Sequence, residues 1–273
     1  MKQVGGVLER TVWYALAFAR RSALGLVLAG LFVAASRVLH AAMAWSWFAP
    51  TSLADMHPFA PMASPLAWAG ALAGWFAAAW VAYLVVGWLQ WALSGREPAF
   101  PAAVGVALGA GLPLLIVNVA LALMLWPVPF PPAGGAYWAY QITGLVALVL
   151  LLPAMVYAAV HAWGFRAALG RLAETLRGTD YGRLLARPGF WVALAPLVLW
   201  LALVPWLGGV ELRLDLDRAL EPQFYGFLFA EALRGFLTTV IGLPIVAASL
   251  RSVYDVVWGA PERASATPAP PAA

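Results

Sequence analysis

The sequence contains no cysteine. Without a thiol the chain cannot form a disulfide, use a thiolate nucleophile, hold an iron–sulfur cluster or bind zinc through cysteine. It also lacks a P-loop, a helical zinc-protease motif and a dinucleotide glycine fingerprint, and no serine, histidine and acid combination has motif spacing. These absences favour a non-enzymatic protein, and we expect no cofactor and no bound metal.

Charged residues are scarce as well. They make up 10% of the chain, while 64% of residues are hydrophobic, whereas soluble proteins carry about 25% charged residues. So few polar groups cannot cover a surface that faces water, and the composition indicates an integral membrane protein. The formal net charge of +4 comes from arginines on short loops, and no basic stripe indicates nucleic acid as a partner.

Long apolar runs dominate what remains. A helix needs about 20 mostly apolar residues to cross the hydrocarbon core, and proline, glycine or charged clusters separate the runs that qualify. We expect an all-α, six-helix membrane bundle in a single polytopic domain over residues 1–258, followed by a disordered Ala/Pro-rich tail over 259–273. The six expected spans are 22–48, 65–93, 101–126, 137–163, 190–210 and 223–250.

Positive charge falls on one side of these spans. Successive spans alternate in direction, so the termini and the loops 94–100 and 164–189 share one side of the membrane. That side carries twelve Lys and Arg residues and the opposite side two. Positive residues stay in the cytoplasm, which predicts an inner-membrane protein with both termini cytoplasmic. The twelve are Lys2, Arg10, Arg20, Arg21, Arg96, Arg166, Arg171, Arg177, Arg183, Arg187, Arg251 and Arg263, and the two are Arg213 and Arg218.

Two cytoplasmic segments are typical of helices that lie on a membrane surface. Residues 165–178 place five apolar side chains on one helical face, with arginines and Glu174 on the remainder. The start of the chain, residues 4–21, is a second candidate, which could instead extend the first span. The five apolar residues are Phe165, Leu169, Leu172, Ala173 and Leu176.

Small residues and prolines suggest how the spans pack. Helices in lipid approach closely where small residues meet, and Gly70-x-x-x-Gly74 and Gly105-x-x-x-Gly109 offer such places, within the bundle rather than at a dimer face. Prolines within spans predict kinks. A Gly-Leu-Pro tripeptide recurs at 111–113 and 242–244 in oppositely directed spans, a pattern typical of inverted-repeat transporters. The prolines are Pro113, Pro153, Pro196, Pro205 and Pro244.

Four ionisable residues lie deep inside two spans. With a rise of about 1.5 Å per residue, Arg37 of the first span and Arg234 of the sixth both lie about 3 Å outside the midplane. His40 and Glu231 both lie about 7 Å outside it. A lone charge at this depth costs about 2.5–3.5 kcal/mol. We therefore expect all four side chains to face inward, with Glu231 accepting hydrogen bonds from one or both arginines.

The charges in this group do not balance. One carboxylate faces two arginines and a histidine, and Asn118 of the third span could add a polar contact. In a structural interpretation Glu231 bridges the arginines, and backbone carbonyls and water do the rest. In a functional interpretation the excess positive charge binds a lipid phosphate or a small oxyanion. A proton relay through His40 and Glu231 is a third hypothesis.

Two outer loops carry acidic residues. Residues 210–223 alternate apolar and charged side chains, which predicts an extended segment, and Asp215-x-Asp217 resembles the metal-binding D-x-D of some glycosyltransferases. Asp55 and His57 could lend two metal ligands in the first outer loop. Solvated loops explain both patterns more simply. The alternative function is a membrane-embedded transferase that uses Asp215 and Asp217.

The C-terminal run GLPIVAASLRSVYDVVWG, with a proline and an aromatic–acidic exit, is similar to the end of some bacterial polytopic membrane domains. The membrane domain attached to some glycerophosphodiester phosphodiesterases is one of these, and SGREPAF at 94–100 resembles it too. The phosphodiesterase barrel is absent, so no catalytic residue is implied. The preferred function is to bind or transport an anionic lipid or small anion, or to scaffold partner membrane subunits.

Overall fold

A computed structural model describes residues 2–48, 65–125, 135–206 and 220–259. These residues form helices and short connections without any strand, which confirms the all-α class for this part of the chain. The extended segment expected over 210–223 falls mostly on 207–219, outside the described residues, and from Leu220 the chain is helical. The helices are α1 Lys2–Arg21, α2 Ala23–Phe48, α3 Pro65–Ser94, α4 Phe100–Leu125, α5 Gly135–His161, α6 Phe165–Gly178, α7 Tyr181–Leu185, α8 Pro188–Trp206 and α9 Leu220–Trp258.

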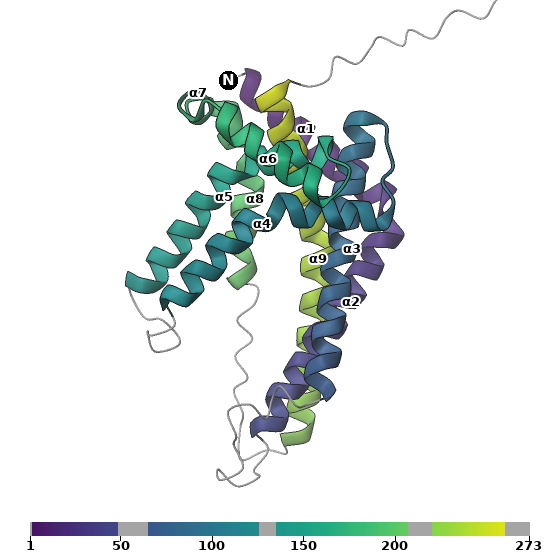
Figure 1. The fold of residues 1–273 in the computed structure, drawn as a ribbon. Coiled ribbons are helices and arrows are strands. Elements are labelled where there is room, and N and C mark those ends of the chain that lie inside the picture. The colour runs from purple at the N-terminus through teal and green to yellow at the C-terminus, as the bar shows by residue number, and fades with distance from the viewer. Residues whose placement is uncertain (1, 49–64, 126–134, 207–219, 260–273) are drawn as a thin grey trace, which may run out of the picture. The chain divides into compact units, whose positions relative to one another are not determined.

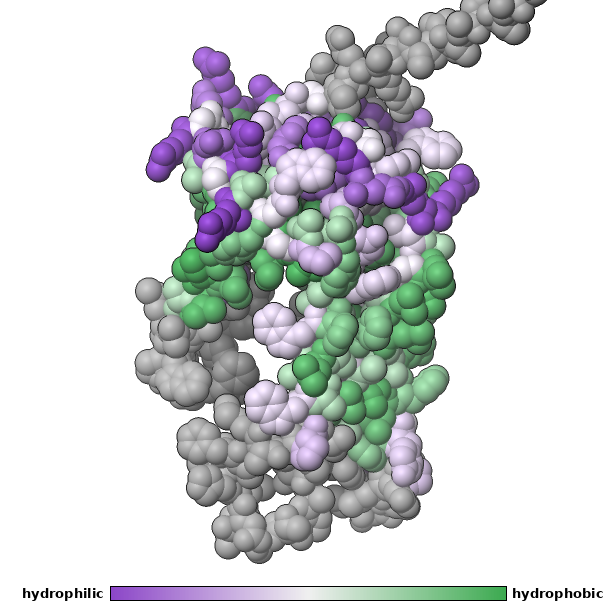
Figure 2. All heavy atoms as spheres, turned by 45° about the vertical axis from the view of Figure 1, so that its right-hand side comes forward, coloured by the Kyte–Doolittle hydropathy of each residue, from purple (hydrophilic) through white to green (hydrophobic). Residues whose placement is uncertain are grey.

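Five of the described helices are long and apolar enough to cross a membrane: α2, α3, α4, α5 and α9. The expected fifth span, 190–210, corresponds to α8, in which the described apolar stretch, Pro188–Leu201, is shorter than a span requires. Large apolar side chains are exposed along these helices, and much of the face drawn in Figure 2 is green for that reason. Exposed apolar flanks are what lipid tails solvate, so the structure supports a multi-pass membrane protein.

The N-terminal segment continues into the first span. α1 and α2 are separated only by Ser22, and the helical hydrogen-bond pattern runs through that residue. The Ser22 amide donates to the Phe18 carbonyl at 2.9 Å, and the Leu26 amide donates to the Ser22 carbonyl at 2.7 Å. Of the two expectations for this segment, the extension of the first helix is therefore the one that the local backbone favours.

Four prolines lie inside described helices rather than at their ends. Pro113 is within α4, Pro153 within α5, Pro196 within α8 and Pro244 within α9, and each helix continues on both sides of its proline. A proline removes one backbone donor and leaves the carbonyl of the preceding turn without its amide partner. Helices in membranes tolerate such a residue when neighbouring groups satisfy the freed carbonyl.

The chain divides into two compact units. Unit 1 comprises Met1–Val12, Val86–Ala195 and Ala248–Ala273, and unit 2 comprises Trp13–Val85 and Pro196–Ala247. The single domain expected over 1–258 stays a prediction, and the tail beyond Gly259 lies outside the described residues.

Unit 1 is built around α4, α5 and α6. Figure 1 shows α6 lying across one end of α4 and α5. Buried Ala110, Ala154 and Ala158 form a core with Leu172 of α6. A side chain at Gly109 would collide with the Phe165 carbonyl, and one at Gly105 would meet the Phe165 amide at 3.3 Å. The second glycine pair predicted from the sequence is thus a helix contact within the chain.

The amphipathic character of α6 is confirmed, but its packed face is narrower than predicted. Ala168 and Leu172 are buried, and Leu169 and Leu176 are half-buried. Phe165 is 42% exposed, and Ala173 is exposed as well. α6 packs on α4 and α5, and only the turns of α6 that meet the glycines and alanines of these two helices are enclosed. Exposed Phe165 is left on the surface.

A buried polar side chain joins α3 to the end of α5 in unit 1. Gln90 of α3 is buried, and its amide nitrogen donates to the carbonyls of Ala159 and Ala162, both at 2.9 Å. These carbonyls belong to the last turn of α5 and its exit, where no further helical amide is available. Gln90 therefore caps α5 from a neighbouring helix.

Unit 2 contains α2, much of α3 and most of α9, which run side by side (Figure 1). α2 contacts α3 at the first predicted glycine pair: a Cβ at Gly70 would meet the His40 ring at 3.0 Å, and one at Gly74 would meet the Ser36 hydroxyl at 3.1 Å. The contact with α9 uses Gly30 of α2 and Gly235 of α9. Glycines thus let α2 approach both neighbours closely, as expected for helices in lipid.

Candidate functional site

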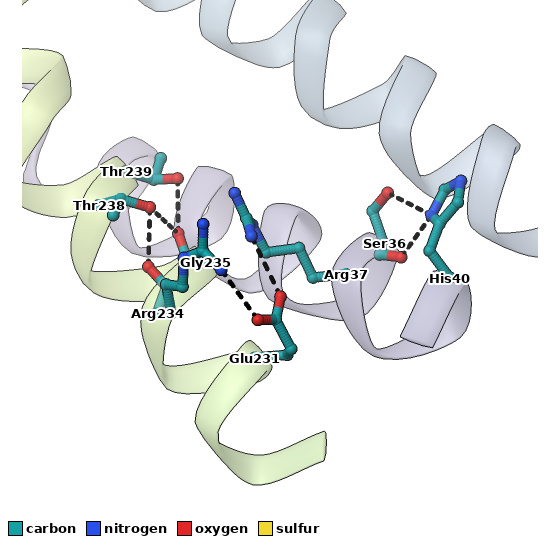
Figure 3. Close-up of polar contacts among 8 residues, drawn as sticks. All are labelled: Ser36, Arg37, His40, Glu231, Arg234, Gly235, Thr238 and Thr239. Carbon is teal, nitrogen blue, oxygen red and sulfur yellow. Dashed lines mark hydrogen bonds and ion pairs between the residues drawn. The ribbon is translucent and has the colours of Figure 1, made fainter. Parts of the chain in front are cut away.

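The site lies in unit 2, where the predicted charges of α2 and α9 meet (Figure 3). Arg37 Nη1 lies 3.1 Å from Glu231 Oε2, and Arg234 Nη1 lies 3.0 Å from Glu231 Oε1. One carboxylate therefore divides its two oxygens between an arginine of the facing helix and an arginine one turn along its own helix. The sequence predicts that Glu231 accepts hydrogen bonds from one or both arginines, and both arginines make such a bond.

The three charged side chains differ in how far they are enclosed. Glu231 is 12% exposed and Arg234 19%, whereas Arg37 is 32% exposed. Two guanidinium groups and one carboxylate carry a formal net charge of +1. Because enclosure weakens solvent screening, this net charge attracts an anion more strongly here than it would at an aqueous surface. Arg37 is the most exposed of the side chains that carry this charge.

Gly235 makes the geometry possible. A Cβ at this position would lie 2.7 Å from Cδ of Arg37 and 3.2 Å from the Ala34 Cα. α2 and α9 therefore cross with backbone almost touching backbone, and the Arg37 side chain passes over the glycine to reach Glu231. A larger residue would separate the helices or displace the arginine.

Two threonine hydroxyl groups follow Arg234 on α9. Thr238 donates to the Arg234 carbonyl at 2.7 Å, and Thr239 donates to the Gly235 carbonyl at 2.8 Å. Such bonds to the preceding turn satisfy a hydroxyl proton without any partner from another helix. These hydroxyls are therefore occupied within α9, and the arginines remain the principal donors of the site.

His40 is near the ion pairs but is turned toward α3, as Figure 3 shows. Its Nδ1 donates to the Ser36 carbonyl at 2.7 Å, since a carbonyl can only accept. The Ser36 hydroxyl in turn donates to the Gly70 carbonyl of α3 at 3.1 Å. His40 thus belongs to the α2–α3 contact, and no ion pair with Glu231 joins it to the arginines.

A cavity of about 410 Å³ opens beside the ion pairs. Arg37 and Glu231 line it, and Arg234 does not. Its other lining residues are Ser36, His40, Ala41 and Phe227. The cavity therefore combines one accessible guanidinium and the polar edge of α2 with two apolar side chains, and its volume lies within the range of about 300–1,000 Å³ found for small-ligand sites.

Asn118, the fifth predicted site residue, belongs to unit 1. Its amide donates to the Leu114 carbonyl of its own helix at 2.8 Å, and its part in the charged cluster stays a prediction. Asp55, His57, Asp215 and Asp217 lie in 49–64 and 207–219, outside the described residues. The transferase hypothesis that rests on the last two has no described geometry.

No known protein family, curated protein or solved structure matches this chain. The resemblance to membrane domains of glycerophosphodiester phosphodiesterases accordingly stays a prediction.

Sequence reasoning missed the residues that shape the site without carrying charge. Gly235 directly follows Arg234, and Gly30 precedes Ala34 by four residues, so a small-residue pair lies on α2 as well. That spacing is the same signal that identified the glycine pairs of α3 and α4. Phe227, one turn before Glu231 on the same face of α9, was likewise recognisable from spacing alone.

Proposed function

We propose that this protein is an inner-membrane protein with six spans and cytoplasmic termini, and that its cavity in unit 2 binds an anionic phosphate or similar oxyanion. The phosphate could belong to a lipid headgroup or to a free ion, because both present the same oxygens to a guanidinium. One observation carries the proposal. Arg37 belongs to a cluster of two arginines and one glutamate with a net positive charge, and it lines a cavity large enough for a ligand.

Charge and donor counts support an anion rather than a cation or a neutral ligand. Among the described residues, Arg37 makes one ion pair, through Nη1 to Glu231. A guanidinium has five donor hydrogens in a planar fork, so most of them remain for an oxyanion. Hydrogen bonds between charged partners are about twice as strong as neutral ones, and low polarity around the site strengthens them further.

Binding is the step that the functions expected from the sequence share. A transporter of anions or anionic lipids must bind its substrate near the middle of the membrane. A scaffold that orders anionic lipid around partner subunits needs the same contact. The cavity gives either function a place to begin, and we propose no chemical reaction at it.

Replacing Arg37 with glutamine should weaken anion binding about tenfold or more, since hydrogen bonds to a charged group contribute about 1.5–3 kcal/mol. Calorimetric titration of the detergent-purified protein with inorganic phosphate tests the free ion. Native mass spectrometry from nanodiscs with phosphatidylglycerol, against phosphatidylcholine alone, tests the lipid. Retention of phosphatidylglycerol without phosphate binding would identify a headgroup as the ligand, and the reverse would identify a free oxyanion.

The matched control for that experiment is Arg171→Gln. Arg171 also pairs with a glutamate, Glu174 at 3.2 Å, but both side chains are more than half exposed. The control removes one positive charge without touching the cavity, so binding should stay at the wild-type level. Equal binding by wild type and Arg37→Gln, to both probes, would reject the proposed function.

The orientation can be tested directly because the chain has no cysteine. Single substitutions Ser64→Cys and Ala219→Cys should react with a membrane-impermeant maleimide added to spheroplasts. Thr179→Cys and Ser265→Cys should react only after the membrane is permeabilised, since the arginine-rich side faces the cytoplasm. Labelling of Thr179→Cys in intact spheroplasts would contradict the proposed topology.

A further inference from the structure

We propose that the Glu231 carboxylate is an internal competitor for the ligand: it holds the position on Arg37 that the bound anion takes, and the anion displaces it. This inference rests on the proposed function and adds a division of labour. Arg37 is the arginine that binds the ligand, and Arg234 is the arginine that holds Glu231 when the ligand arrives.

The contacts of Glu231 are suited to exchange. Each oxygen meets one Nη1 atom, at 3.1 Å on Arg37 and 3.0 Å on Arg234. Neither pair has the two parallel bonds of a fork–fork arrangement, which is the more stable geometry for arginine and carboxylate. A tetrahedral phosphate offers more acceptor oxygens to Arg37 than the single oxygen that Glu231 presents to it.

The two ion pairs of Glu231 differ in how readily each can be broken. Glu231 and Arg234 lie three residues apart on α9, so their contact is local and persists when α2 shifts. Arg37 comes from α2 and is the most exposed of the three charged side chains. Exchange at Arg37 therefore leaves the glutamate paired, whereas exchange at Arg234 would remove its local partner.

The cavity supports the same assignment. Arg37 and Glu231 both line it, but Arg234 does not. A ligand in the cavity thus meets Arg37 together with the carboxylate that neutralises it. Two anions next to each other repel, so a bound oxyanion and Glu231 cannot both stay on Arg37 at low cost. The glutamate withdraws toward Arg234 in the bound state.

The decisive test is the double variant Glu231→Gln with Arg234→Gln, titrated with inorganic phosphate in detergent and with phosphatidylglycerol nanodiscs. It removes one negative and one positive charge, so its formal charge equals that of wild type, while the competitor is gone. We expect affinity about tenfold higher than wild type, because Arg37 no longer has to release a carboxylate. Size-exclusion chromatography and thermal unfolding verify that the variant is folded.

A second charge-conserving variant, Glu231→Asp, keeps the test decisive if the double variant does not fold. Its side chain is one methylene shorter, so a carboxylate that stays with Arg234 no longer reaches Arg37, and affinity should again rise. Affinity equal to or below wild type in the folded variants would overturn the inference while leaving the proposed function intact. Absence of anion binding by wild type would overturn both.

Discussion

Replacing Glu231 with alanine in phosphate-free buffer should lower the free energy of unfolding by about 3 kcal/mol. The substitution leaves Arg37 and Arg234 on facing helices without the carboxylate that joins them. Removing one partner from an enclosed ion pair leaves an uncompensated charge, which costs about 3–5 kcal/mol. The lower end applies here because Arg37 is 32% exposed. Unfolding in mixed detergent micelles, monitored by tryptophan fluorescence, measures the change.

A triple variant separates the cost of an unpaired charge from the loss of an interaction. Replacing Arg37, Glu231 and Arg234 together by leucine removes every charge and fills the same space with apolar groups. Such exchanges are often neutral or stabilising, so this variant should be more stable than Glu231→Ala alone. If Glu231→Ala stayed within about 0.5 kcal/mol of wild type, as surface substitutions do, the ion pairs would have to be solvated and the charge argument would be wrong.

The contact between Arg37 and Glu231 was predictable because depth depends on few quantities. Helix rise is nearly constant and antiparallel spans run between the same two surfaces, so residue number converts to height. Rotation about the helix axis is not fixed by depth. His40 shares its height with Glu231 but faces α3, where its ring packs on Gly70. Height therefore predicted the ion pair, but it could not predict the direction of the His40 ring, which lines the same cavity and turns toward α3.

The helix contacts show a similar division. Spacing of small residues predicted that Gly70, Gly74, Gly105 and Gly109 meet other helices of the chain, and each does. Spacing could not name the partner, because one small-residue face accepts any helix whose own surface fits it. Gly109 receives the start of α6, a helix expected to lie on the membrane surface, because Phe165 follows a short connection after α5.

The crossing of α2 and α9 should be the most sensitive packing contact of the site. Replacing Gly235 with alanine should lower the free energy of unfolding by about 1–3 kcal/mol, the usual cost of overpacking. The added Cβ would lie 3.2 Å from the Ala34 Cα and 3.3 Å from the Ala34 amide nitrogen. Backbone atoms cannot rotate away as a side chain does, so the helices themselves must separate.

Gly226→Ala is the matched control, because a Cβ at Gly226 meets no described atom within 4 Å. Both substitutions lie on α9 and gain the same helix propensity, about 1 kcal/mol for glycine to alanine. Their difference therefore isolates the helix contact. Gly235→Ala should in addition weaken phosphate binding, since the new methyl group lies 2.7 Å from the Arg37 Cδ and displaces the guanidinium from the cavity. Equal stability of the two alanine variants would mean that α2 and α9 have room to separate, and that the position of Arg37 does not depend on their close approach.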